Sequence, residues 1–388
     1  MSENLRNSPL HAVHEAAGAS FTDFGGWNMP LKYGSELAEH KAVRSAAGIF
    51  DLSHMGEVRV TGPEAGEMLD YALSSVMSTL KPGRAKYSLC LTDAGTVLDD
   101  LIVYRMDDGA EGSVPEYLVV PNAGNAASVY TALAQRASGR DVTVTDESAD
   151  TSLVAVQGPQ AEQILAQAMP AHVQELAELK YFAHITLALP TGAGDVEVLV
   201  ARTGYTGEDG FELFVHAGSP EEAGDRGSAV WNAVVKAAEA AGVELTPCGL
   251  ASRDSLRLEA GMPLYGNELD NAHQPHASGV SFAVPASKET DFVGKSALQG
   301  KDEVSQVLVG LKGAGRRAAR HSYAVQDTEG NVIGEVTSGA PSPTLGHPIA
   351  MARIDRAFAA EGTELLVDLR GRGESFSVVP LPFYRRER

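Results

Sequence analysis

Two adjacent aspartates, Asp99 and Asp100, lie inside an apolar and β-branched stretch, residues 97–104. A carboxylate among such residues is costly to bury unless it is paired or hydrogen-bonded, so this pair is a candidate for chemistry. Neighbouring residues of a strand point to opposite faces, which groups Asp100 with Ile102 and Tyr104 and leaves Asp99 on the other face. The two acids therefore do not form an acid/base pair unless a bulge redirects one of them.

The alternative is that both aspartates cap the end of a hairpin in solvent. Residues 87–91 and 97–104 have the composition of strands, and residues 92–95 (TDAG) between them favour a turn in which Gly95 takes a positive φ. The alternation of side chains between the two faces of a strand (strand parity) does not by itself say which face of this hairpin carries a site. Both interpretations stay open at this point.

Other polar side chains have the chemistry to hold a small ligand. Glutamate and asparagine oxygens accept hydrogen bonds, and an arginine forms charge-assisted bonds with a carboxylate. Each also has an ordinary alternative, since Arg253, Asp254 and Arg257 could form a solvated helix face with local ion pairs. The candidate polar anchors are Tyr87, Asp100, Tyr104, Asn122, Glu212 and Arg253.

Recognised metal and nucleotide motifs do not occur in the sequence. Among the 11 histidines, His273 and His276 lie near Asp270, but this is not a known metal-ligand spacing. The glycine-rich residues 204–210 match no phosphate-binding fingerprint and lead into a strand, so we interpret them as a tight turn that places Glu212. We therefore expect no metal.

The 388 residues carry a formal net charge of −20, and 44% of them are hydrophobic. This length accommodates two or three domains with their own cores. So acidic a surface repels phosphate backbones, and we expect no nucleic-acid partner. The sequence has no apolar run near ~18 residues, no secretory signal and only two cysteines, Cys90 and Cys248, so we expect a cytoplasmic protein without membrane contact.

Helices and strands alternate in the first 285 residues. Capping residues and apolar spacing predict a helix at 35–47, with Ser35 as N-cap and Gly48 at its end. Further helices are predicted to begin after residues 61–64, to run from 121–124 to about 137, and to end at Gly242. A last helix is predicted from Thr246-Pro247 to Gly261. Strands are predicted at 58–60, 117–120, 184–189, 196–201 and 211–215, the last with Phe211, Leu213 and Val215 facing away from Glu212 and Phe214.

Two broader patterns indicate the domain organisation. Residues 60–69 (VTGPEAGEML) parallel residues 156–165 (VQGPQAEQIL), each a strand, a Gly-Pro step and a helix, which predicts two related α+β modules. From about residue 300 the chain is typical of an all-β barrel or sandwich-like domain. Its expected strands lie at 306–311, 331–336, 347–354, 364–369 and 375–380, with a turn at 338–343 (SGAPSP).

Five segments resemble the glycine cleavage system T protein (aminomethyltransferase) family. They are residues 51–56 (DLSHMG), 98–104 (LDDLIVY), 202–210 (RTGYTGEDG), 253–266 (RDSLRLEAGMPLYG) and 336–339 (VTSG). The resemblance runs from about residue 8 to residues 382–384 (PFY), and its most specific part is the 253–266 block.

This resemblance implies an α+β fold of three domains in a cloverleaf-like arrangement around a central folate channel. The expected domains are an α+β domain of residues 1–50 and 146–285 with Glu212 and Arg253, an α+β domain of residues 51–145 with the Asp100 hairpin, and a C-terminal β-barrel domain of residues 286–388.

The resemblance also implies a reaction, in which an aminomethyl group on the dihydrolipoyl arm of the lipoylated H protein passes to tetrahydrofolate. The products are 5,10-methylenetetrahydrofolate, ammonia and the reduced arm. By position, Asp100 matches the key acid. The implied folate-site residues are Met55, Tyr87, Tyr104, Asn122, Glu212, Arg253 and, from the C-terminal tail, Arg386, with Arg385 as the alternative. Tetrahydrofolate is then a substrate, and neither a metal nor a flavin is expected.

Two alternative functions remain at this point. One is a relative that uses another one-carbon donor, such as a folate-dependent demethylase of the dimethylglycine/sarcosine type; no flavin-binding dinucleotide motif supports its oxidase form. The other is a non-catalytic folate-binding assembly protein. Such a protein is expected to carry a Lys-Gly-Cys-Tyr-type motif, which neither Cys90 nor Cys248 matches.

Overall fold

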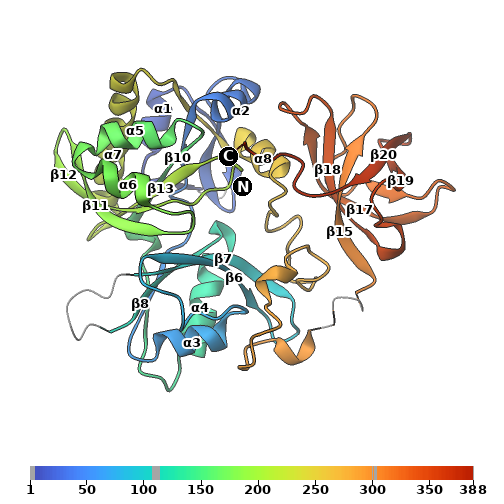
Figure 1. The fold of residues 1–388 in the computed structure, drawn as a ribbon, viewed down its shortest axis with the longest axis horizontal. Coiled ribbons are helices and arrows are strands. Elements are labelled where there is room, and N and C mark those ends of the chain that lie inside the picture. Colours follow the sequence, from blue (N-terminus) through green and yellow to red (C-terminus); the bar gives the residue numbers. More distant parts are fainter. Residues whose placement is uncertain (1–4, 107–113, 299, 301–303, 388) are drawn as a thin grey trace.

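Three bodies surround a common centre in the computed structural model, which describes residues 5–106, 114–298, 300 and 304–387 (Figure 1). Two of the bodies combine a sheet with helices, and the third is a closed barrel. The predicted α+β class with a C-terminal barrel is therefore confirmed, whereas the exact domain limits stay a prediction. In the described part of the chain, no helix is long and apolar enough to cross a membrane.

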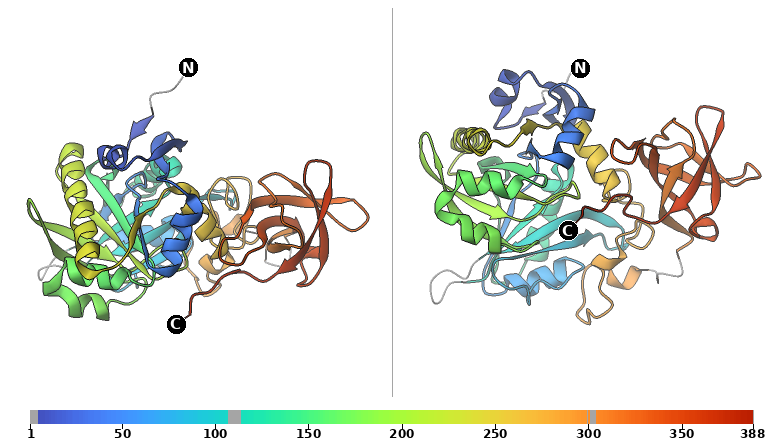
Figure 2. Two further views of the ribbon diagram at one scale, coloured as in Figure 1. Left: turned by 90° about the horizontal axis from the view of Figure 1, so that it is seen from above. Right: turned by 45° about the horizontal axis from the view of Figure 1, so that its top comes forward.

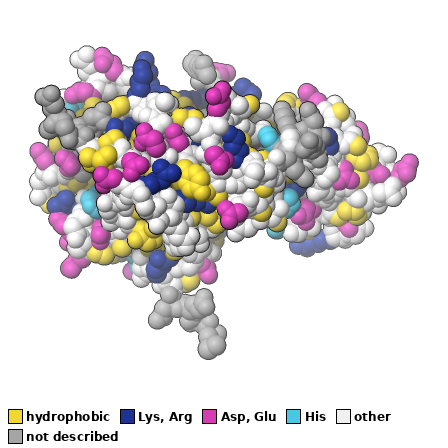
Figure 3. Space-filling view, turned by 90° about the horizontal axis from the view of Figure 1, so that it is seen from below, with side chains coloured by type: hydrophobic (Ala, Val, Ile, Leu, Met, Phe, Trp, Pro, Cys, Tyr) yellow, Lys and Arg dark blue, Asp and Glu magenta, His cyan; other side chains and the backbone are white. Residues whose placement is uncertain are grey.

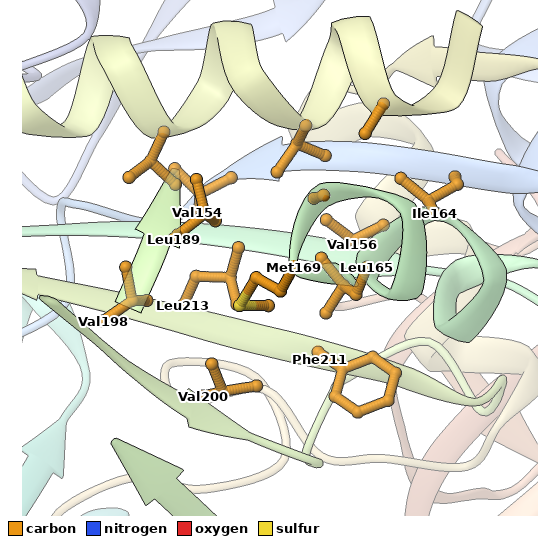
Figure 4. Close-up of a cluster of buried hydrophobic side chains, with 14 of the residues drawn as sticks. Val154, Val156, Ile164, Leu165, Met169, Leu189, Val198, Val200, Phe211 and Leu213 are labelled. Carbon is orange, nitrogen blue, oxygen red and sulfur yellow. The ribbon is translucent and has the colours of Figure 1, made fainter. Parts of the chain in front are cut away.

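The first mixed body is built on a six-stranded sheet. Its strands, in spatial order, are β11 (His184–Thr191), β12 (Gly194–Ala201), β13 (Gly210–His216), β10 (Thr151–Gln157), β4 (Ala47–Asp51) and β14 (Leu245–Pro247). Helices α5 (Ala161–Ala168), α6 (Val173–Glu178) and α7 (Pro220–Ala241) belong to this body. Apolar side chains from one face of the sheet and from these helices form its core (Figure 4). Phe211 and Leu213 point into that core, which leaves Glu212 on the opposite face as predicted.

The second mixed body has a five-stranded sheet. Its strands, in spatial order, are β6 (Arg84–Leu91), β7 (Val97–Arg105), β8 (Glu116–Pro121), β5 (Val58–Thr61) and β9 (Thr143–Asp146), with helices α3 (Ala65–Ala72) and α4 (Ala126–Arg136). The strand before each Gly-Pro step, β5 or β10, lies fourth in its sheet, beside three consecutive antiparallel strands. Gly62 and Gly158 share nearly the same backbone φ, 140° and 135°. The predicted pair of related modules is therefore confirmed.

The central hairpin of the second body is β6 and β7. Gly95 in its turn has a φ of 73°, as predicted. Leu89 lies opposite Asp100, and Cys90 lies opposite Asp99. Asp99 is completely buried on the core side of the sheet, so the interpretation that both aspartates cap the hairpin in solvent is wrong.

The C-terminal barrel closes in the order β15 (Gln306–Gly313), β18 (Pro348–Asp355), β17 (Val332–Pro341), β16 (Ala324–Gln326), β19 (Glu364–Asp368) and β20 (Gly373–Val379). The predicted turn at 338–343 is partly wrong, because β17 continues through Ser338 after a register shift and ends at Pro341. Strand β16 was not predicted, since three residues give too short a pattern.

Two helix ends predicted from the sequence differ from those in the structure. Helix α2 (Glu36–Ser45) has Ser35 as its N-cap, but Gly48 lies within β4, where a Cβ would meet a methyl group of Val43 at 2.5 Å. Thr246-Pro247 does not open a helix: it belongs to β14 at the sheet edge, a position that tolerates proline. Helix α8 (Leu250–Glu259) begins after Gly249.

The N-terminal segment and the C-terminal tail both lie against the first mixed body (Figure 2). The N-terminal elements are α1 (His11–Ala16) and a small sheet of β1 (Arg6–Asn7), β3 (Trp27–Lys32) and β2 (Ser20–Phe24). The tail returns from the barrel, and the amide of Tyr384 donates to the carbonyl oxygen of Glu259 at 2.8 Å.

A buried carboxylate joins helix α8 to the barrel. Glu259 accepts hydrogen bonds from Arg44, at 2.8 Å from Nη2, and from the hydroxyl groups of Ser342 and Thr344 in the turn between β17 and β18. His40 lies 3.1 Å away on its other side. Burial acts to raise the pKa of Glu259, but the bonds from His40, Ser342 and Arg44 outweigh it and lower that pKa to about 2.

Glu259→Gln is expected to lower the free energy of unfolding by about 3–5 kcal/mol, because it leaves the buried guanidinium of Arg44 without this carboxylate. The stabilisation that this carboxylate provides is complete above its ordinary pKa of 4.5 and is lost as the pH falls toward 2. Urea denaturation at neutral pH measures the change. The matched control is Glu361→Gln on the exposed barrel surface, with an expected change within about 0.5 kcal/mol. Equal effects of the two substitutions would contradict this role.

Candidate active site

A cavity of about 280 Å³ lies between the two mixed bodies. Its walls come from the 51–55 segment, from β7, β8 and β13, from the 202–210 loop and from α8. Seven of the eight predicted site residues line it: Met55, Tyr87, Asp100, Tyr104, Asn122, Glu212 and Arg253. Residues separated by up to about 200 positions in the sequence thus meet at one place.

Strand parity explains how the two sheets contribute to this cavity. On β7, Asp100, Ile102 and Tyr104 face it, while Val103 packs in the core of the second body. On β13, Glu212 and Phe214 face it, while Leu213 packs in the core of the first body. Each sheet therefore turns one face to its own helices and the other to the cavity.

Asp100 is held by two donors from neighbouring strands. The hydroxyl of Tyr87 on β6 donates to Oδ2 at 3.1 Å, and the Nδ2 of Asn122, just after β8, donates to Oδ1 at 2.8 Å. Burial raises the pKa of Asp100 to about 6, although both hydrogen bonds act in the opposite direction. The carboxyl faces the cavity, where a proton or a cation can approach it.

Asp99 occupies the opposite face and is fully buried. It accepts from the amide N–H and from Nδ2 of Asn122, both at 2.9 Å, and from Nδ2 of Asn125 at 2.7 Å. Burial and the charge of Asp100 raise the pKa of Asp99. Its hydrogen-bonding capacity is directed to the protein and not to the cavity.

Glu212 forms a second acidic position across the cavity. Its Oε2 accepts from the hydroxyl of Thr203, and the hydroxyl of Tyr104 lies 3.4 Å from the same oxygen. Burial raises the pKa of Glu212, while the bond from Thr203 partly offsets this rise. Burial and the charge of Glu212 together raise the pKa of Tyr104, so the phenol keeps its proton and can donate.

Arg253 supplies positive charge to a site with two acids. Its guanidinium lies over the ring of Tyr205, 4.6 Å from the centroid, and it forms no ion pair with any residue that the structure describes. Burial lowers its pKa, but an arginine remains cationic at neutral pH. The guanidinium is therefore available to a ligand carboxylate.

Comparisons with known proteins agree with this geometry. The family model of the GCVT N-terminal domain matches residues 10–288, and that of the glycine cleavage T-protein C-terminal barrel domain matches residues 306–385. The chain belongs to the glycine cleavage T-protein family. It is 52% identical to the aminomethyltransferase of Cutibacterium acnes (98% of this chain, 99% of the relative) and 53% identical to that of Streptomyces coelicolor (100% of both).

A solved structure supports the same family fold. The crystal structure of glycine cleavage system aminomethyltransferase T from Bartonella henselae matches with a TM-score of 0.86 and 36% sequence identity, over 98% of each chain. The predicted membership of the T-protein family is thus confirmed.

The structure of this T-protein family member adds cavity residues that the sequence reasoning missed. His54 is buried beside Met55, no residue that the structure describes hydrogen-bonds its Nδ1, and burial and the charge of Arg253 lower its pKa to about 4. Phe282 is 72% exposed and stacks on Tyr87 with ring centroids 5.5 Å apart. His54 lies within the 51–56 segment (DLSHMG) that the sequence analysis singled out, but Phe282 comes from a loop without regular periodicity.

The predicted C-terminal arginine does not line the cavity. Arg386 places Nη1 3.3 Å from Oδ1 of Asp209, which is also bound by Arg202. Arg385 is exposed. Burial and the charge of Glu212 raise the pKa of Tyr181, a cavity residue, and the charge of Arg386 acts to lower it. A role for Arg386 in ligand binding stays a prediction.

The histidine loop that the sequence analysis considered for metal binding forms a local hydrogen bond. The Nδ1 of His273 lies 2.7 Å from Oδ1 of Asp270. Within the described ranges, no group of three or more His, Cys, Asp or Glu side chains could hold a metal ion.

The pKa of the Asp100 carboxyl is expected to lie above the ordinary range of an aspartate, and Tyr87→Phe is expected to raise this midpoint further because the carboxylate loses a hydrogen-bond donor. Carbon NMR of protein labelled at aspartate carboxyl groups measures both values. Tyr71→Phe, at a surface tyrosine outside the cavity, is the control and should leave the midpoint unchanged. A midpoint below about 4 would contradict the effect of burial, since that is the ordinary range of an aspartate.

Proposed function

We propose that the protein is the tetrahydrofolate-dependent aminomethyltransferase of a glycine cleavage system. The observation that carries the proposal is that one cavity of a T-protein family fold holds both Asp100 and Arg253, an arginine that forms no ion pair with any described residue. The aminomethyltransferase names of full-length relatives support the same activity.

The cavity has suitable groups for each part of a reduced folate. Arg253 can bind the glutamate carboxylate of the folate by charge-assisted, bidentate bonds. Glu212 and the Oδ1 of Asn122 can accept from the donor-rich edge of the pterin. Met55 provides an apolar contact for the ring. Because the chain has a net charge of −20, this local positive charge is needed to hold an anionic substrate.

The proposed chemistry joins one carbon to two folate nitrogens. Nitrogen attacks the methylene carbon and the C–S bond of the arm breaks; the amine then leaves as the second nitrogen closes the ring. The two N–H protons lost from the folate end on the released thiol and on ammonia. Asp100 is placed to stabilise a cationic iminium-like species and to orient the attacking nitrogen, and preorganised charge of this kind is typically a large catalytic term. Holding both substrates together adds proximity.

The proposed partner is the lipoylated H protein, whose arm delivers the aminomethyl group. On the face shown in Figure 3, acidic, basic and hydrophobic side chains are interspersed, and the net charge of −20 is unfavourable for a nucleic-acid partner. We propose a cytoplasmic location without membrane contact. We also propose that the reaction uses no flavin.

Asp100→Asn is expected to reduce turnover about 10²- to 10³-fold, because the amide removes the negative charge that the cationic intermediate requires. The assay measures ammonia released from aminomethyl-loaded H protein, which the unaltered enzyme should release only when tetrahydrofolate is added. Asp93→Asn, an exposed acid in the turn of the same hairpin, is the matched control with expected normal turnover.

Two outcomes would contradict this proposal. Near-normal turnover of Asp100→Asn would remove Asp100 from the role given to it. Turnover of dimethylglycine or sarcosine, with none of aminomethyl-loaded H protein, would show that the one-carbon donor is not the H protein.

Arg253→Gln is expected to raise the KM for tetrahydrofolate about 10- to 100-fold with a smaller effect on kcat, because the lost charge-assisted bonds serve binding. Steady-state kinetics with varied folate measures both constants. The control is Arg226→Gln on the exposed part of α7, which pairs with Glu222. An unchanged KM in the Arg253 variant would show that the folate carboxylate binds elsewhere.

A further inference from the structure

We infer that Asp99, which does not line the cavity, is a positioning residue that fixes the side-chain amide of Asn122 so that the cavity meets its oxygen and not its nitrogen. This inference rests on the proposed function and names a specificity determinant of that same site: the ligand must present an N–H donor to Asn122.

Three oxygen atoms surround the side-chain nitrogen of Asn122. Nδ2 lies 2.9 Å from Oδ1 of Asp99, 2.8 Å from Oδ1 of Asp100 and 3.0 Å from the main-chain oxygen of Asp100. An amide nitrogen has two protons for these acceptors, whereas an amide oxygen in its place would face three oxygens with nothing to donate. The orientation of the amide is therefore determined by the two aspartates.

Asp99 also holds the backbone from which this amide projects. Its Oδ2 accepts the main-chain N–H of Asn122 at 2.9 Å, and Nδ2 of Asn125 donates to Oδ1 at 2.7 Å. The side chain of Asp99 is fully buried on the core face of β7. A substitution there reaches the cavity through the residues that Asp99 contacts, of which Asn122 lines it.

The oxygen of Asn122 is left for the ligand. Asn122 lines the cavity, both of its amide protons serve Asp99 and Asp100, and no described residue donates to Oδ1. Asp100 and Glu212 are also acceptors, so this side of the cavity is rich in oxygen. A site built to receive a donor strongly rejects a ligand that lacks it, because the site group is then left unpaired. The N–H-rich edge of a reduced pterin is the chemical class that fits.

A double-mutant cycle on tetrahydrofolate binding tests this inference. Asp99→Asn is expected to weaken the affinity about 10-fold in the otherwise unaltered protein, because an amide, with one oxygen in place of two, cannot accept as the carboxyl does from both the main-chain N–H and the Nδ2 of Asn122. In an Asn122→Ala background the same substitution is expected to change the affinity less than about two-fold, since nothing remains for it to orient. Thermal unfolding of each variant, followed beside binding, separates a loss of stability from a loss of orientation.

Equal effects of Asp99→Asn in both backgrounds would overturn the inference. If that variant does not fold, Asn125→Ala gives a second test, because Asn125 touches Asp99 but does not line the cavity. It is expected to weaken tetrahydrofolate binding several-fold, and unchanged binding would overturn the inference. Failure of the unaltered protein to bind tetrahydrofolate would instead overturn the proposed function.

Discussion

The site depends on two carboxyl groups held next to each other inside a β-strand. Burying Asp99 and Asp100 is unfavourable unless donors meet them, and the donors come from β6, from the residue after β8 and from the start of α4. These hydrogen bonds tie β6 and the end of β8 to β7 at the cavity. The same arrangement keeps one acid accessible to a ligand and its neighbour buried among core residues.

The two related modules make this arrangement possible. Each has one sheet face covered by its own helices, so the other face is free to meet the partner module, and Asp100 and Glu212 approach the cavity from opposite sheets. Helix α8 adds Arg253 between them. The barrel braces that helix through Glu259 and through Arg257, whose Nη2 lies 2.8 Å from the hydroxyl of Ser338. The barrel thus supports the cavity without lining it.

Much of the fold and of the candidate site could be predicted from the sequence, because it follows from short-range rules. Parity on one strand separates Asp99 from Asp100, and parity on another directs Glu212 away from the core. The Gly-Pro repeat predicts two related modules, and the structure shows that their strand orders agree. What parity could not supply was the choice of face, which came from the family resemblance and agrees with the cavity.

The features that were missed depend on tertiary contacts. Gly48 serves close packing against Val43 and Cys248, which a sequence pattern cannot distinguish from a helix stop. Pro247 is tolerated because its strand lies at the sheet edge. Phe282 reaches Tyr87 from a loop almost 200 residues away in the sequence. Long-range partners of this kind leave no local periodicity.

The central claim is that the face of β7 that carries Asp100 forms the binding site for a reduced folate. A crystal structure with tetrahydrofolate bound is the most direct test of it. The account predicts the pterin in contact with Asp100, Glu212 and Tyr104 and the glutamate carboxylate at Arg253. A pterin bound outside this cavity, with Asp100 free of ligand contact, would contradict it.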